Sequence, residues 1–266
     1  MNKLYFFISL IVISCNTFNA YETSSITHNQ ILNDKTIKND SNKTQSYLPK
    51  SNGQLINHSS FSLAYNEKHE QAIWVYYILT KKMIKGNVER TNDFRIDKKV
   101  NEGSAELSDY RNSGYDRGHL APAADMKNSS ISMSESFLFS NISPQDPSFN
   151  RGIWKKLESL VREWVVSEGY MHIATGPILT ESLGKIGDNQ VTIPKSFYKI
   201  IYCNQKEKMI GFIIPNKRSN DYLVTYATTI DYIESITNIN FFSELDDFHE
   251  KELESNINLL DWNFKN

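Results

Sequence analysis

The sequence predicts an α+β fold and not a doubly wound α/β fold. Strand-like runs rich in β-branched and aromatic residues dominate its second half, and only one long segment has a clear helical period. Strands and helices therefore do not alternate regularly, as a doubly wound sheet requires. A chain of 266 residues, 39% hydrophobic and 23% charged, is long enough for one sizeable domain with a tail, or at most two small domains.

The N-terminus has the pattern of an export signal. Lys3 precedes an apolar run at residues 4–14, which is too short to span a bilayer and suits a signal peptide. A small serine directly before Cys15 resembles the bacterial lipoprotein signal, in which the cysteine becomes the lipidated first residue, and we favour this interpretation. The alternative is conventional cleavage after "FNA" at 18–20, which is a poor site because phenylalanine is bulky. We expect residues 1–20 to be a signal region.

The rest of the chain divides into a polar stretch and a folded domain. Residues 21–46 show no hydrophobic period and are typical of a flexible tether, so we expect the domain at 47–266. Residues 85–120 are typical of loop with short strands, and 136–145 form a short apolar run. The other expected elements are strands at 71–80, 170–179, 196–203 and 209–216, helices at 151–168 and 228–239, and an acidic, solvated helical tail at 243–257.

Charge and cysteine content exclude some classes of protein. A formal net charge of -2 gives no global basic field of the histone-like kind, although a local cationic groove is compatible with it. The cysteines are Cys15 and Cys203, and lipidation or removal of the first would leave the second without a disulfide partner. We expect Cys203 to be a buried structural thiol, and two cysteines alone cannot form a zinc site.

The helix at 151–168 begins next to a polar residue on its apolar face. With about 100° per residue, Asn150 points in the direction around which the apolar positions gather. Those positions are Trp154, Leu157, Leu160, Val161, Trp164 and Val165. An inward-facing amide must find partners, either as an N-cap of the helix or by holding a ligand. Glu158, at the edge of the apolar face, either pairs with Arg162 at i+4 or adds a carboxylate to the same place.

The four residues Asp116 to His119, "DRGH", carry groups suited to phosphate chemistry. His119 can take a proton near neutral pH, because an unperturbed histidine has a pKa of about 6.5. Arg117 matches the geometry of a phosphate oxyanion with two hydrogen bonds. Gly118 is expected to allow a tight turn, and Asp116 to pair with Arg117 or another nearby cation.

These motifs together resemble the DNA/RNA non-specific endonucleases of the ββα-metal (His-Me finger) type, the group that includes mitochondrial endonuclease G. The resemblance runs from about residue 47 to the 230s. It rests on "RTNDFRID", "DYRNSGYDRGHLAPAADM", "FLFSNISPQ", "FNRGIWKKLE", "ATGPIL" and "IPKSFYKII", which occur in this order. It implies a central, mainly antiparallel sheet flanked by helices, with a ββα-metal active site.

The resemblance also implies roles for individual residues. His119 would be the general base that activates water, and Asn150 the sole direct protein ligand of Mg²⁺, for which Mn²⁺ could substitute. A single amide is enough in physical terms, because Mg²⁺ prefers oxygen ligands and keeps several waters. The remaining matches are Glu158 on the metal's water shell, Asn141 as a supporting asparagine, Arg117 facing phosphate, and Arg90 as a second arginine for which Arg95 is the rival.

Positive residues on both sides of the motif indicate the substrate. They are Lys81, Lys82, Lys85, Arg90, Arg95, Lys98, Lys99, Arg151, Lys155 and Lys156. Such groups contact phosphates without reading sequence, so both DNA and RNA are expected as substrates, with weak sequence preference. The family resemblance implies products with 5′-phosphate ends.

Two alternatives remain from the sequence, a non-catalytic binding lipoprotein and a phosphodiesterase for small nucleotides. We expect an exported protein of a bacterium that is secreted, periplasmic or lipid-anchored at the cell surface, with membrane contact only through Cys15.

Overall fold

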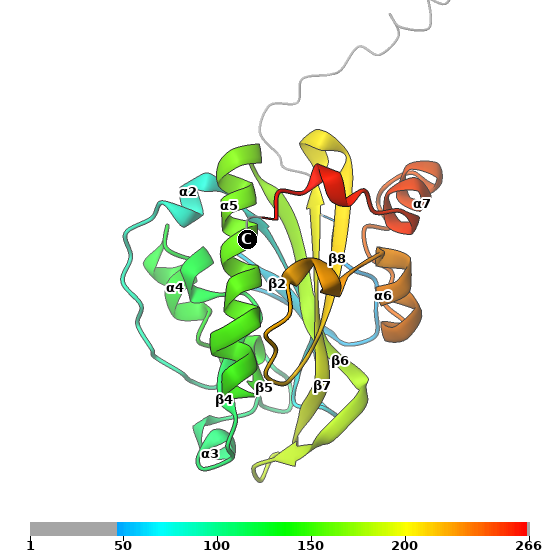
Figure 1. Ribbon diagram of the computed structural model, residues 1–266. Helices are drawn as coiled ribbons and strands as arrows, with labels where there is room; N and C mark the ends of the chain where they lie inside the picture. The colour runs from blue at the N-terminus through cyan, green and yellow to red at the C-terminus, as the bar shows by residue number, and fades with distance from the viewer. Residues whose placement is uncertain (1–46, 265–266) are drawn as a thin grey trace, which may run out of the picture. The chain divides into compact units, whose positions relative to one another are not determined.

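The structure is a computed structural model that describes residues 47–264 (Figure 1). These residues fall in one compact unit, Ser46–Asn266. The expected signal region, the lipidation of Cys15 and the tether at 21–46 lie outside the described residues. In the described part of the chain, no helix is long and apolar enough to cross a membrane.

The centre of the domain is a seven-stranded sheet in the order β1-β2-β3-β6-β7-β8-β9, with every neighbouring pair antiparallel. The expected α+β class with a mainly antiparallel sheet is therefore confirmed. The strands are β1 Gln54–Asn57, β2 Ser62–Asn66, β3 Gln71–Leu79, β6 Met171–Ile186, β7 Val191–Cys203, β8 Lys208–Pro215 and β9 Ala227–Thr228. Each predicted strand overlaps one of them, although β6 runs seven residues further than expected.

The sheet is covered on both faces because its strands alternate two sets of apolar side chains. On β7, Phe197 and Ile201 belong to the core beneath helix α5 (Lys155–Glu168). Tyr198 and Ile200 belong to a second core on the opposite face, which includes residues of helix α6 (Ile230–Thr237). Helix α7 (Asp247–Ser255) lies beside α6 on that side (Figure 1).

Helix α5 presents the face that its sequence predicts. Leu157, Leu160, Val161, Trp164 and Val165 are all buried, and Gly169 ends the helix at φ 118° as expected of a C-cap glycine. The regular helix starts four residues later than predicted. It follows a π-helical turn, η3 (Phe149–Trp154), in which Gly152 has non-helical φ/ψ of -104° and -111°.

A separate pair of strands lies at the N-terminal end of α5. Strand β4 (Asp116–His119) pairs antiparallel with β5 (Ile142–Gln145), and η3 and α5 follow directly, which makes a ββα unit (Figure 1). The short helices around it are α2 Lys81–Ile84, α3 Leu107–Tyr110 and α4 Ser130–Glu135, and the 3₁₀ turns of the domain are Ala123–Asp125, Phe139–Asn141, Asn204–Lys206, Leu223–Tyr226 and Leu259–Asp261.

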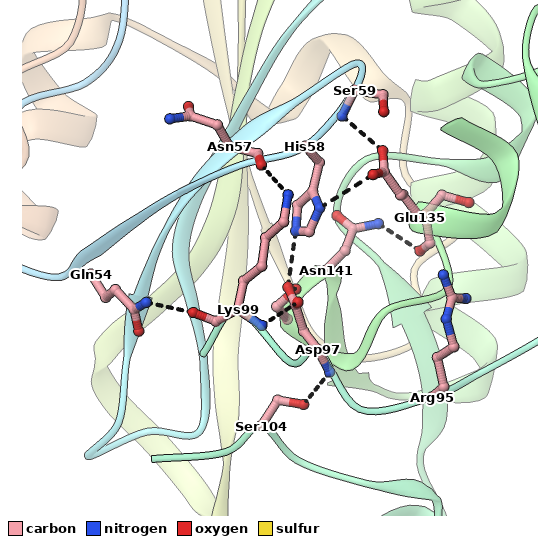
Figure 2. A network of polar contacts seen from close by, with 12 residues as sticks. Gln54, Asn57, His58, Ser59, Arg95, Asp97, Lys99, Ser104, Glu135 and Asn141 are labelled. Carbon is pink, nitrogen blue, oxygen red and sulfur yellow. Dashed lines mark hydrogen bonds and ion pairs between the residues drawn. The ribbon is translucent and has the colours of Figure 1, made fainter. Parts of the chain in front are cut away.

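The irregular segment 85–104 is held in place by side chains and not by a sheet. Figure 2 shows His58 between two carboxylates, with Nε2 at 2.9 Å from Asp97 and Nδ1 at 3.8 Å from Glu135. Lys99 donates from Nζ to the Asn57 carbonyl at 2.6 Å. These contacts join segment 85–104 to the β1–β2 turn and to α4. They thereby fix the position of the residues in segment 85–104 that lie near β4.

The acidic tail is a helix at Asp247–Ser255, but it is not only a solvated face. The chain returns from α7 to α5, where Trp262 is buried and packs at a tilt against Trp164, with 4.7 Å between the ring centroids. The Trp164 indole N–H donates to the Asn263 carbonyl at 2.9 Å. Apolar residues after the helix therefore stabilise α5. Cys203 is buried and free, as expected.

Replacing Trp262 tests this contact. Trp262→Ala removes an aromatic side chain from the core cluster that includes α5, so the free energy of unfolding should fall by about 3–5 kcal/mol. Guanidinium denaturation followed by tryptophan fluorescence and circular dichroism measures the change. Leu260→Ala is the matched control, because Leu260 lies in the same segment and is 94% exposed. Equal stability of the two variants would show that the return segment does not support α5.

Candidate active site

A positively charged cleft of about 480 Å³ opens beside β4. Its lining includes the arginines Arg90, Arg111, Arg117 and Arg151, together with Asp116, Asn150, Phe94, Tyr110 and Tyr115. Asp116 is the one carboxylate in this lining, and it is engaged by Arg151. The remaining guanidinium groups make the cleft suited to an anion.

His119 lies at the end of β4, behind this lining. Its ring packs edge-on against Phe137 at 4.8 Å and against Phe94 at 5.6 Å. Burial, together with the positive charges of Arg90 and Arg117, lowers the pKa of His119 to about 3. Its Nε2 has no hydrogen-bond partner among the described residues. At neutral pH the imidazole is therefore uncharged and able to accept a proton.

Arg90 and Arg117 flank the aromatic pocket that holds His119. The Arg117 guanidinium carbon lies 4.2 Å from the Phe94 ring centroid, and that of Arg90 lies 4.7 Å from the Phe137 centroid. Cation–π contact of this kind orients a guanidinium without using its N–H donors. Arg95 instead bonds Asp93 and the Ser134 carbonyl, and it does not line the cleft. The structure brings Arg90, and not Arg95, close to the histidine.

The expectation that Gly118 allows a tight turn is wrong, and glycine occurs at this position for a different reason. It lies within strand β4 opposite Ser143. A Cβ at this position would stand 2.1 Å from the Gln145 side chain of β5. Glycine is required here because the neighbouring strand's side chain crosses directly over the backbone.

Asn150 is held by Asp116 and is not an N-cap. Its Nδ2 donates to Asp116 Oδ2 at 2.9 Å, and Arg151 Nε donates to the same oxygen at 2.8 Å. The capping role belongs to Asp146, whose Oδ1 accepts from the Ser148 N–H at 2.8 Å. Asp116 pairs with Arg151 and not with Arg117. With its amide nitrogen committed to Asp116, Asn150 has its oxygen Oδ1 left to bind a ligand.

Glu158, on α5, lies near the charged groups of Asp125, Arg162 and Lys199. Arg162 binds Asp125 at 2.9 Å, so the i+4 pair of Glu158 with Arg162 does not form. Burial raises the pKa of the Glu158 carboxyl, and the nearby Lys199 ammonium opposes this rise. Glu158 therefore depends on surrounding positive charge to be ionised.

Lys199 of β7 was not identified from the sequence. It is 1% exposed, and its Nζ, which has no hydrogen-bond partner in the part of the chain that the structure describes, lies 4.9 Å from the Trp154 ring centroid. Burial lowers the pKa of this lysine, whereas Glu158 and Asp125 raise it. A lysine inside the apolar run "SFYKIIYC" was the available signal.

Asn141 is fully buried and supports the backbone next to His119. Its Oδ1 accepts from the Ala121 N–H at 2.9 Å, and its Nδ2 donates to the Ala121 and Ser136 carbonyls at 3.0 and 2.8 Å. Its side chain thus fixes the segment that leaves β4, and it does not line the cleft.

The positive residues expected around the motif are only partly gathered there. Of that set, Arg90 and Arg151 line the cleft, and Arg111 was not anticipated. Lys81 and Lys82 lie on α2, and Lys85 follows it. A second groove of about 690 Å³ shares Arg151 with the cleft and adds Lys155, Lys156 and Tyr222, which is 69% exposed.

Comparison with known proteins identifies similar chains. The sequence model of the DNA/RNA non-specific endonuclease family matches residues 39–248. A nuclease of Nostoc sp. is 33% identical over 236 residues, 83% of this chain and 84% of that protein. Human mitochondrial endonuclease G is 32% identical over 205 residues, 71% of this chain and 69% of that protein. A chain in the crystal structure of the EndoG/EndoGI complex matches with a TM-score of 0.69 and 28% identity, over 74% of this chain and 88% of that chain.

Proposed function

We propose that this chain, which belongs to the DNA/RNA non-specific endonuclease family, is a Mg²⁺-dependent nuclease that hydrolyses phosphodiester bonds in both DNA and RNA. The observation that carries the proposal is the uncharged, unpaired His119 beside a cleft lined by arginines and by Asn150. Each of these groups has a part in the reaction.

The cleft and its neighbouring groove favour a polymeric substrate over a small nucleotide. Arginine side chains would bind consecutive phosphates, and Arg151 is shared between the two hollows. Beyond Arg151, Lys155 and Lys156 continue the positive surface, and exposed Tyr222 offers a ring for base stacking. Phosphate contacts and stacking do not distinguish bases, which supports weak sequence preference and the use of both nucleic acids.

His119 acts as the general base. Its ring nitrogen accepts a proton from a water molecule, the water oxygen forms a bond to phosphorus, and the bond from phosphorus to the 3′ oxygen breaks, with the leaving oxygen taking up a proton from solvent. The products carry a 5′-phosphate and a 3′-hydroxyl. Arg90 and Arg117 bind the phosphate oxygens. Because a bound phosphate offsets the positive charges that lower the His119 pKa, substrate binding raises the basicity of the imidazole.

The residues present fit a Mg²⁺ ion at Asn150. Mg²⁺ prefers oxygen ligands and retains several waters, so one amide oxygen suffices. Asp116 orients that amide, and Glu158, on the following helix, would accept hydrogen bonds from the water shell of the ion. When bound, Mg²⁺ supplies positive charge at the phosphate and at the leaving oxygen.

Plasmid cleavage tests the two central residues. In Mg²⁺ the wild-type chain should nick and linearise plasmid, and EDTA should stop it. His119→Ala should lower turnover by about 10²–10⁴-fold through loss of the general base. Asn150→Ala should lower activity and raise the Mg²⁺ concentration needed for half-maximal rate. His249→Ala, at a partly exposed histidine on α7, is the control. Turnover of His119→Ala near the wild-type rate would refute the general-base role.

Lys199→Met tests how Glu158 is kept ionised. Removing the ammonium takes away the charge that lowers the Glu158 pKa, so that pKa rises and a smaller fraction is ionised at a given pH. The acid limb of the kcat profile should therefore move to higher pH, with activity recovering in alkaline buffer.

Lys208→Met is the matched control for this experiment. Lys208 is also buried, but it pairs at 2.7 Å with Glu168 at the far end of α5. A uniform loss of activity at every pH in Lys199→Met would mean that Lys199 serves packing alone.

We also propose that the protein is exported and lipid-anchored through Cys15, on the pattern of residues 1–20. Palmitate should label the protein in its bacterial host, and Cys15→Ser should abolish the label. Export without label in both chains would indicate conventional signal cleavage instead.

A further inference from the structure

Three carboxylates converge on the face of the sheet opposite α5. Asp231 and Glu234 come from α6, and Glu254 comes from the last turn of α7. One oxygen of each lies within 4.8 Å of the others. These helices lie far from the ββα unit in the chain and contribute nothing to the cleft lining.

Glu254 is the unusual member of this cluster. Its side chain is 3% exposed, and Oε1 has no hydrogen-bond partner among residues 47–264. Burying a carboxyl oxygen without a partner is costly, and an acidic neighbour increases the cost when the group is ionised. The protein's own groups therefore leave Oε1 of Glu254 able to bind a ligand.

Nearby protein groups do not neutralise the three acids. Within the described part of the chain, no ion pair reaches Asp231, Glu234 or Glu254. Glu234 accepts one hydrogen bond, from the Phe241 N–H at 2.7 Å. The cluster consequently lacks positive charge.

The spacing and chemistry of the donors point to one class of ion. An all-oxygen donor set favours Ca²⁺ or Mg²⁺ over zinc or copper. Mg²⁺ demands near-ideal octahedral geometry, whereas Ca²⁺ accepts a flexible arrangement of protein oxygens, and the three oxygens here lie within 4.8 Å of one another, close enough to share one ion. Asp231 is exposed, so water can complete the larger coordination shell that Ca²⁺ takes.

We infer that Asp231, Glu234 and Glu254 form a calcium site that joins α6 to α7. The site is independent of the nuclease reaction, and its buried ligand lies beyond the stretch 39–248 that the family model matches. Bound calcium stabilises α7 and, through the segment that follows, the contact of Trp262 with α5.

Calcium titration of the metal-stripped full chain tests the site. Isothermal calorimetry should give a Kd of about 10⁻⁴ M, in the range of extracellular calcium modules. Saturating Ca²⁺ should raise Tm by roughly 5–10 °C. Both effects should persist in Asn150→Ala, which removes the proposed active-site ligand. Loss of both effects in that variant would assign the calcium to the cleft and overturn the inference.

Variants of the cluster complete the test. Glu254→Gln should abolish calorimetric binding and the Tm shift, whereas Glu252→Gln, at an exposed position on the same helix, should keep both. Asp231→Asn changes only an exposed side chain, so the fold is preserved, and it should weaken binding about tenfold. A wild-type chain that shows no calcium effect, with the acids sharing protons instead, would refute the site. An equal response in wild type and Glu254→Gln would do the same.

Discussion

The contact of Asp116 with Asn150 and Arg151 is the constraint on which the proposed chemistry depends. It joins the strand that ends in His119 to the turn that precedes α5, across 34 residues of sequence. Because the same carboxylate accepts from both residues, it sets the orientation of the Asn150 amide and draws one arginine across the mouth of the cleft. The proposed general base and the proposed metal ligand are thus placed relative to each other by a single side chain.

Beneath this contact, the domain accepts buried charge at some cost to stability. Asp125, Arg162, Glu158 and Lys199 lie between α5 and the sheet, where apolar residues would pack without a desolvation penalty. Asp125 forms an ion pair with Arg162 and also accepts a hydrogen bond from the Tyr77 hydroxyl at 2.8 Å. Glu158 and Lys199 form no comparable ion pair within the described part of the chain, although the charge of each shifts the pKa of the other.

The sequence was most informative where structure depends on neighbours along the chain. The buried face of α5 and its end at Gly169 follow from the local sequence. The sequence did not predict why position 118 is glycine, that Asp146 caps the helix, or that Lys199 is buried. Each of these depends on contacts made by folding. Gln145 crosses Gly118 only once β4 pairs with β5. The sequence also did not predict that Arg111 lines the cleft, or the path of segment 85–104, since long-range side-chain bonds hold that segment.

The packing of Trp262 against Trp164 also has a consequence for the timing of folding. Every strand of the sheet and α5 itself are synthesised before Trp262. Until then Trp164 lacks the Trp262 and Phe264 rings, and Phe212 lacks Phe264. A chain that stops short of Trp262 therefore leaves the second half of α5 less completely covered, because Trp164 keeps its contact with Phe212 and loses the two later rings.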